Sequence, residues 1–107
     1  MNKVTENIKI WAVERDLHKA DPNKQMLKLI EEIGELSSAM VRSDEWEISD
    51  GLGDIYVVLT ILAMQLGYDL ENCIEEAYEE IKDRQGEMVN GVFVKDEDLP
   101  IRPEVSE

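Results

Sequence analysis

The feature that most constrains the fold is the segment from Ile55 to Leu66, in which nearly every residue is apolar. No face of such a segment suits water, so other parts of the protein must surround it. Its β-branched residues favour a strand, but its length and the Gly67 that follows favour a helix, because glycine commonly ends helices. We therefore predict a buried core helix over residues 45–66.

Apolar residues at spacings of three and four predict amphipathic helices on both sides of this segment. Asp21 followed by Pro22 is a helix start signal, Asp69 caps another helix, and Gly86 ends it. With the core helix, the predicted helices cover residues 4–18, 22–42, 45–66 and 70–85. The pattern predicts one all-α domain over residues 1–107, organised as a four-helix bundle-like subunit.

The second predicted helix carries an apolar stripe that we expect to face the core of the subunit. The stripe consists of Met26, Ile30, Ile33, Ser37 and Met40. The other short helices can cover only part of the core helix, so its remaining side is expected to pack against a second copy of the chain. We therefore predict a homo-oligomer, either a homodimer or a tetramer.

Residues 87–107 form a predicted C-terminal tail with little regular structure. The segment from Met88 to Val94 contains Asn90-Gly91, which is typical of a short extended segment or a hairpin. The remainder combines acidic residues with prolines and has little to bury, so we expect a loose or partner-docked arm.

The formal net charge of −14 in 107 residues excludes several classes of partner. Such a charge repels nucleic acids and anionic membranes, so we predict neither as a partner, whereas cations are favoured. Cys73 is the single cysteine, which rules out an intramolecular disulfide, and the N-terminal residues lack the apolar stretch of a secretory signal. These features predict a cytoplasmic protein.

Two of the predicted helices carry acidic side chains that repeat along one face. The residues are Lys28, Glu31, Glu32 and Glu35 on the second helix and Glu47, Asp50 and Asp54 on the third. The first group occupies the arc opposite the apolar stripe. Carboxylates on facing helices repel each other unless cations lie between them, and oxygen ligands suit magnesium or manganese. The pattern indicates a divalent-metal site; in so acidic a chain, the alternative is a solvated face.

Two glycines strengthen the metal-site interpretation. Gly34 and Gly53 each lie inside a predicted helix, where glycine costs about 1 kcal/mol relative to alanine, and each adjoins a candidate carboxylate. Glycine persists more readily where a neighbouring backbone or a ligand approaches closely. The two positions therefore favour a cleft between the second and third helices.

The order and spacing of three segments resemble those of a known enzyme family. The run from Lys28 to Leu36, KLIEEIGEL, resembles the signature of MazG-like all-α nucleotide pyrophosphohydrolases. The run DGLGD at residues 50–54, followed by apolar residues, is similar to the second half of that signature. The run WAVER at residues 11–15 is similar to the family's first helix, and together the segments span roughly residues 11–66.

The resemblance implies magnesium-dependent hydrolysis of (deoxy)nucleoside triphosphates to a nucleoside monophosphate and pyrophosphate. It implies that Glu32, Glu35 and Asp54 bind Mg²⁺, with Mn²⁺ as a possible substitute, and that Lys28 lies near the phosphates. Either Glu31 or Glu35 is expected to act as the general base that accepts the proton of the attacking water.

This chain departs from the family pattern at one position. The family usually has a glutamate where this chain has Gly51. Asp50 lies one helical turn before Asp54 and could replace it, and Glu47, a further turn away, is the other candidate. The metal set predicted from the sequence is therefore completed by Asp50 or by Glu47.

Three further side chains are candidates for binding the substrate. Trp11 could stack on a nucleobase, as the resemblance implies for the first helix, or could belong to the core. Lys82 and Arg84 could contact phosphate oxygens, or could pair with nearby glutamates and the negative end of their helix.

The main alternative to an enzyme is a non-catalytic acidic helical dimer that acts as a regulatory or interaction protein. Gly51 supports this alternative because it removes a carboxylate from the family's pattern. A mimic of nucleic-acid charge is a second alternative, but it does not explain acidic residues placed beside helix glycines.

Overall fold

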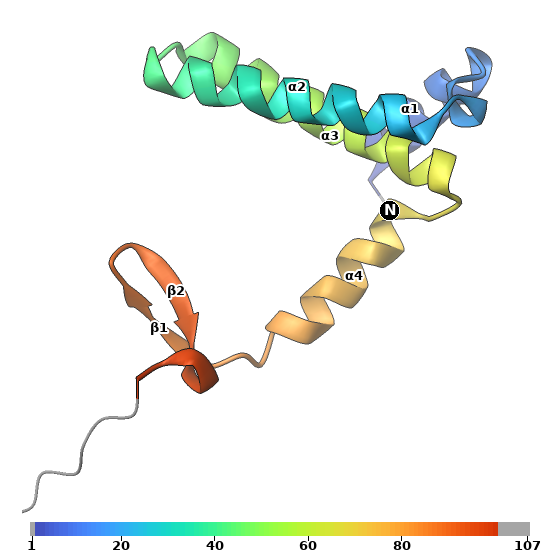
Figure 1. Ribbon diagram of the computed structural model, residues 1–107. Coiled ribbons are helices and arrows are strands. Elements are labelled where there is room, and N and C mark those ends of the chain that lie inside the picture. The colour runs from blue at the N-terminus through green and yellow to red at the C-terminus, as the bar shows by residue number, and fades with distance from the viewer. Residues whose placement is uncertain (1, 101–107) are drawn as a thin grey trace, which may run out of the picture. The chain divides into compact units, whose positions relative to one another are not determined.

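The computed structural model describes residues 2–100, which form four α-helices and one two-stranded hairpin. The elements are α1 (Lys3–Glu14), η1 (Leu17–Lys19), α2 (Pro22–Val41), α3 (Glu45–Leu66), α4 (Leu70–Ile81), β1 (Gly86–Val89), β2 (Val92–Lys95) and η2 (Asp96–Asp98) (Figure 1). The chain divides into two compact units, one up to Ile74 and the other from Glu75 onward, and each is described by itself. The prediction of a mostly helical chain is confirmed.

The ends of the helices follow from local capping. The side chain of Asp21 accepts a hydrogen bond from the backbone of Asn23, and that of Asp44 accepts one from Glu47. Asp69 likewise accepts from the backbone of Glu71. Gly67 ends α3 in the left-handed conformation, with φ of 82°. The sequence located these signals correctly.

Two helices are shorter than predicted. The first ends at Glu14 instead of residue 18, because Asp16 takes a left-handed conformation with φ of 58° and the short η1 follows. The fourth ends at Ile81 instead of residue 85. Beyond Ile81, the backbone carbonyl of Gln85 accepts a hydrogen bond from the backbone N–H of Asp96. Gln85 therefore belongs to the base of the hairpin and not to the helix.

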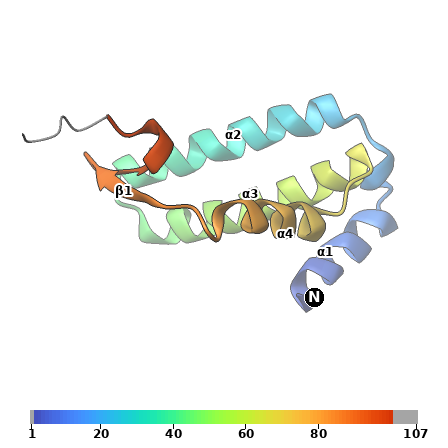
Figure 2. The same cartoon turned by 90° about the horizontal axis from the view of Figure 1, so that it is seen from below.

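The core of the first unit lies between α2 and α3, which run side by side in opposite directions (Figure 2). Leu29 of α2 packs with Val58 and Leu62 of α3, and Ile55 and Leu59 pack against this cluster. Burial of each large aliphatic side chain contributes roughly 1.5–3 kcal/mol before the entropic cost of ordering it. The α2–α3 pair is therefore the rigid part on which other groups are positioned.

The first helix packs against α3. Ala12 and Thr5 are buried, and the Thr5 hydroxyl lies 2.6 Å from the hydroxyl of Tyr56. Lys9 lies 3.6 Å from Glu6 and 3.7 Å from Asp69. The hydroxyl contact attaches α1 to α3, and the Lys9–Asp69 ion pair links α1 to the residue that caps α4.

The predicted core helix is confirmed, and its strand alternative is excluded. Its second half is buried at Val58 and from Thr60 to Ala63, whereas Leu52 and Leu66 remain exposed in the described chain. Taken singly, none of the helices within residues 2–100 combines the length and the apolar character needed to cross a membrane.

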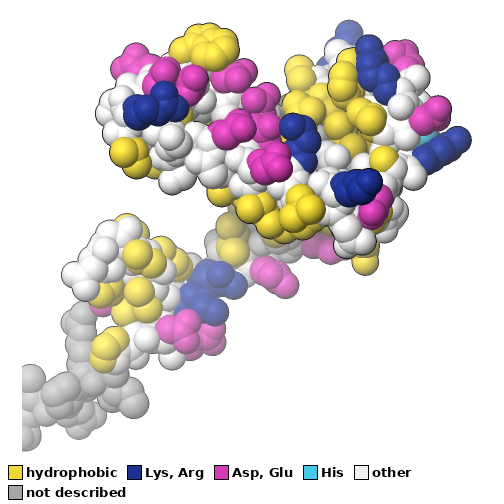
Figure 3. All heavy atoms as spheres, turned by 45° about the horizontal axis from the view of Figure 1, so that its top comes forward, with side chains coloured by type: hydrophobic (Ala, Val, Ile, Leu, Met, Phe, Trp, Pro, Cys, Tyr) yellow, Lys and Arg dark blue, Asp and Glu magenta, His cyan; other side chains and the backbone are white. Residues whose placement is uncertain are grey.

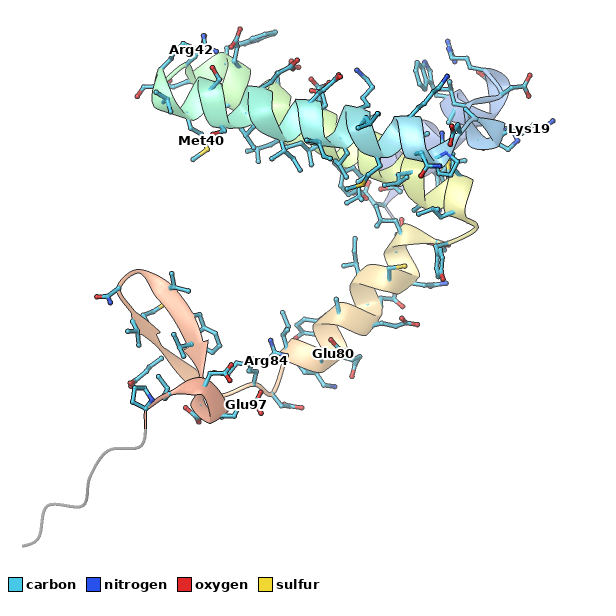
Figure 4. All side chains as sticks on the ribbon, in the orientation of Figure 1. Lys19, Met40, Arg42, Glu80, Arg84 and Glu97 are labelled. Carbon is cyan, nitrogen blue, oxygen red and sulfur yellow. The ribbon has the colours of Figure 1, made fainter. Side chains whose placement is uncertain are left out.

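The prediction for the inner face of α2 is wrong. The stripe expected to face the core is exposed at Met26, Ile30, Ile33, Ser37 and Met40. The buried residues of α2 are instead Leu29, Glu32 and Ala39. The side of α2 that faces α3 therefore includes Glu32, one of the predicted carboxylate ligands. Met40 and Arg42 project from different sides of the α2 end (Figure 4), and Figure 3 shows hydrophobic side chains exposed among charged ones.

The second unit contains the hairpin that Asn90-Gly91 predicted. β1 pairs antiparallel with β2 in a register that joins Gly86 to Lys95 and Val89 to Val92. Asn90 and Gly91 both have positive φ, 51° and 79°, as a two-residue turn of this kind requires. Residues 101–107 of the predicted tail lie outside the described residues.

Candidate active site

A groove of about 250 Å³ lies between the second half of α2 and the first half of α3. Its lining residues are Glu35, Ser38, Arg42, Trp46, Glu47, Asp50, Gly51 and Asp54. Four of these residues carry carboxylates and one, Arg42, carries a positive charge. The groove therefore combines ligands for a cation with one group suited to an anion.

Helical spacing explains why these side chains share one groove. On α2, Ser38 and Arg42 follow Glu35 at intervals of three and four residues. On α3, Asp50 and Asp54 are one turn apart. Since residues three and four apart lie on one face of a helix, each helix directs a row of polar side chains into the groove.

The half-buried Asp54 carboxyl has a perturbed environment. Burial raises its pKa above the ordinary value, and the negative charges of Asp50 and Glu32 raise the pKa further, as does a hydrogen bond with Asp50. The positive charge of Lys28 lowers the pKa of Asp54. Charges from both helices therefore act on Asp54, and a cation placed among these carboxylates would relieve the repulsion.

The carboxylate of Glu32 is buried next to this cluster. The residue is only 9% exposed, and its Oε1 lies 3.4 Å from Nζ of Lys28, one turn earlier on α2. A buried carboxylate is costly unless a positive charge compensates it. Lys28 supplies this charge, and its own side chain stays 57% exposed.

At the α2–α3 turn, Arg42 pairs with two acidic residues. Its Nη2 lies 2.6 Å from Oε2 of Glu47, and its Nη1 lies 3.8 Å from Oδ2 of Asp44. The hydrogen bond and the charge of Glu47 raise the pKa of the Arg42 guanidinium. Figure 4 shows Arg42 at this end of the helix pair, whereas Lys19 lies at the other end.

The donor set suits a hard divalent cation, although the side chains are not arranged around one. Within residues 2–100, no three acidic, histidine or cysteine side chains converge closely enough to hold a metal ion. Carboxylates without a cation between them repel each other. Glu35 and Asp50 are exposed in the groove, and Asp50 hydrogen-bonds Asp54.

The lining of this groove does not include Glu32 or Lys28, nor the other predicted site residues. Glu31 is exposed on α2. Trp11 lines a separate apolar groove with residues of α1 and with Val57, and the Arg15 guanidinium lies 4.3 Å from the centre of its ring. In the second unit, Lys82 lies 2.7 Å from Glu79. Arg84 lines a groove of that unit among acidic residues.

The close approach predicted at Gly34 and Gly53 is not found among the described residues. A Cβ added at either position would meet nothing within 4 Å. Gly51 is instead the glycine at the helix contact, where a Cβ would lie 3.4 Å from side-chain atoms of Leu36. The position where the family carries a glutamate therefore faces α2, and both proposed replacements, Asp50 and Glu47, line the groove.

The sequence interpretation missed Ser38, Arg42 and Trp46 as groove residues. A signal for two of them was present, because Ser38 and Arg42 continue the helical spacing of Glu35. The position of Trp46 in the groove depends on the path of the turn between α2 and α3, in which Ser43 has a φ of 55°. That conformation cannot be read from residue type.

The chain matches the sequence model of the MazG-like family over residues 25–92, more than half of its length. The chain belongs to the MazG-like family. The MazG-like match includes most of α2 and all of α3, the two helices that form the groove, whereas α1 and Trp11 lie outside it.

One relative of this MazG-like chain is an uncharacterized 18.2 kDa protein from the rep-hol intergenic region of Haemophilus phage HP1 (strain HP1c1). The two are 41% identical over 66 residues, which is 61% of this chain. The chain spans only 40% of the length of the phage protein. No solved structure gives a significant match.

Proposed function

We propose that this chain hydrolyses nucleoside or deoxynucleoside triphosphates to the monophosphate and pyrophosphate, with Mg²⁺ or Mn²⁺ as the cofactor. Family membership supports the reaction class, and the groove between α2 and α3 contains four carboxylates, the type of ligand that Mg²⁺ prefers. The observation that carries the proposal is that carboxylates from both helices line one groove: Glu35 from α2, and Glu47, Asp50 and Asp54 from α3.

In this proposal, the metal ligands come from both helices. They are Glu32, Glu35, Asp50 and Asp54, with Glu47 as the alternative to Asp50. Bound divalent ions neutralise phosphate charge and lower the pKa of coordinated water. Lys28 compensates the charge of Glu32. We propose that Lys28 also attracts the phosphate chain.

Water attacks the α-phosphorus, and the bond from that phosphorus to the bridging oxygen breaks. The oxygen of the water stays on the monophosphate, and the electron pair of the broken bond leaves with pyrophosphate. Glu35 is favoured over Glu31 to accept the proton of the water, because Glu35 lines the groove and Glu31 does not.

The test is incubation with a panel of ribo- and deoxyribonucleoside triphosphates, with separate detection of pyrophosphate and orthophosphate. Pyrophosphate release should require Mg²⁺ or Mn²⁺, stop with a chelator and fall about 100-fold or more in Glu35→Gln. The matched control is Glu45→Gln, an exposed glutamate of α3 outside the groove, which should keep full activity. Orthophosphate as the first product would refute cleavage at the α-phosphorus.

A non-catalytic acidic protein is the second candidate, and Gly51 favours it because the position lacks a carboxylate. A chain of this kind would release no pyrophosphate from any triphosphate in the panel. Mg²⁺ would then also give little thermal stabilisation, whereas a metal enzyme gains stability by mass action.

We also propose that the chain self-associates through α2 and acts in a cytoplasmic compartment. The exposed stripe gives α2 an apolar face that the described residues of its own unit leave open to water. Contiguous exposed apolar surface of this kind commonly marks an interaction site. A second copy is the occupant that we propose.

A further inference from the structure

We propose that the substrate's nucleobase stacks on Trp46, beside the Arg42–Glu47 ion pair, at the α2–α3 turn. This inference rests on the proposed function and adds the location of the base to it. It differs from the expectation for Trp11, whose groove contains no carboxylate among its lining residues.

Trp46 has no evident structural role in the described chain. Its side chain is 73% exposed although it lines the same groove as Glu35, Asp50 and Asp54. A hydrophobic staple would need an apolar residue just before the N-cap, but Ser43 precedes the cap residue Asp44. An exposed indole beside a polar groove offers a flat surface for a base, since every base has a π-face.

The size of the groove requires the base to lie at an open end. Its volume of about 250 Å³ is below the roughly 300–1,000 Å³ typical of sites that enclose a small ligand. The carboxylates therefore enclose the metal and the phosphate chain, and the base extends beyond them. Along α3, Trp46 lies about 6 Å from Asp50 and about 12 Å from Asp54, at a rise of about 1.5 Å per residue.

The Arg42–Glu47 pair is fixed beside Trp46 on the wall of the groove. Its 2.6 Å hydrogen bond joins the end of α2 to the first turn of α3. The guanidinium keeps further N–H donors free, and the carboxylate keeps further acceptor positions. The pair can therefore hydrogen-bond the edge of a stacked base, whereas the metal and Lys28 interact with the phosphates.

Single-tryptophan variants test the stacking directly, because Trp11 and Trp46 are the two tryptophans of the chain. The probes are α,β-methylene analogues of the common nucleoside triphosphates, added with Mg²⁺. In Trp11→Phe, where the fluorescence comes from Trp46, the analogues should quench the emission. In Trp46→Phe they should leave the emission unchanged. Quenching only of Trp11 would overturn the inference.

Kinetics provide the second readout. Trp46→Ala should raise KM about 10-fold or more with kcat changed less than about twofold, because base stacking binds substrate without touching the reacting atoms. Trp46→Phe should recover most of the loss. An unchanged KM in Trp46→Ala, with Glu35→Gln inactive, would overturn the base site and leave the proposed function intact. Quenching of Trp46 without hydrolysis would support the base site and refute the reaction, and the absence of both would refute both.

Discussion

Nζ of Lys28 lies 3.4 Å from Oε1 of Glu32, and this pair joins the accessible surface of α2 to a carboxylate that is buried against α3. The arrangement is costly to the fold, because it removes a charged group from water for one partly exposed counter-ion. Such a cost is typical of a functional position.

Removal of the positive charge should destabilise the metal-free protein. In Lys28→Met, Glu32 stays buried without its ion pair, so the free energy of unfolding should fall by about 1 kcal/mol. Urea unfolding in the presence of a chelator measures this change. Lys24→Met, an exposed lysine of the same helix, is the control and should change stability little. Equal effects of the two variants would show that Lys28 does not compensate Glu32.

Removal of the Asp54 charge should have the opposite effect. Burial and the neighbouring carboxylates raise the pKa of Asp54, so its stabilising contribution is present at low pH and is lost as pH rises through the folded-state value. At neutral pH, Asp54→Asn should therefore unfold at higher urea than the wild type in metal-free buffer. The gain should shrink as pH falls toward the ordinary aspartate value of about 3.9. A loss of stability at neutral pH would contradict the assignment of Asp54 to a repulsive cluster.

Replacement of the two helix glycines that have free space around them should stabilise the protein. Gly34 and Gly53 have free space where a Cβ would lie, so Gly34→Ala and Gly53→Ala should each raise the free energy of unfolding by about 0.5–1 kcal/mol. Gly51→Ala should gain less, because its Cβ would meet Leu36 at 3.4 Å. Chemical denaturation compares the three variants. A loss at Gly34 or Gly53 would show that another molecule packs on that position.

The exposed stripe predicts self-association. Ile33 is 50% exposed in the middle of that stripe, so Ile33→Glu should shift the sedimentation of the protein toward the monomer. Lys24→Glu introduces the same side chain elsewhere on α2 and should leave the assembly unchanged. A wild-type protein that sediments as a monomer would contradict the prediction.

The fold could be predicted from the sequence where local chemistry determines it. Asp21 and Gly67 act through their own backbone neighbours, so the helix boundaries that they set were correct. The inner face of α2 was not predicted, because the apolar stripe is the most hydrophobic side of the helix and yet the side with Leu29 and Ala39 contacts α3. Periodicity locates an apolar face but does not identify what covers it.

The candidate site could be predicted only where helical spacing alone brings its residues together. Glu35, Asp50 and Asp54 were found from helical spacing, and the structure brings them to one groove. Trp46 was not found, because its position depends on how the turn between the helices folds. Ser38 and Arg42 were overlooked although they continue the helical spacing of Glu35.

Binding of Mn²⁺, followed by electron paramagnetic resonance of the free ion, tests the central claim most directly. The wild-type protein should bind Mn²⁺, and Glu32→Gln and Asp54→Asn should each weaken binding by about 10-fold or more, because they remove ligands contributed by different helices. Glu45→Gln should bind as the wild type does. Equal Mn²⁺ affinity in all four proteins, or no binding by the wild type, would contradict a metal site between α2 and α3.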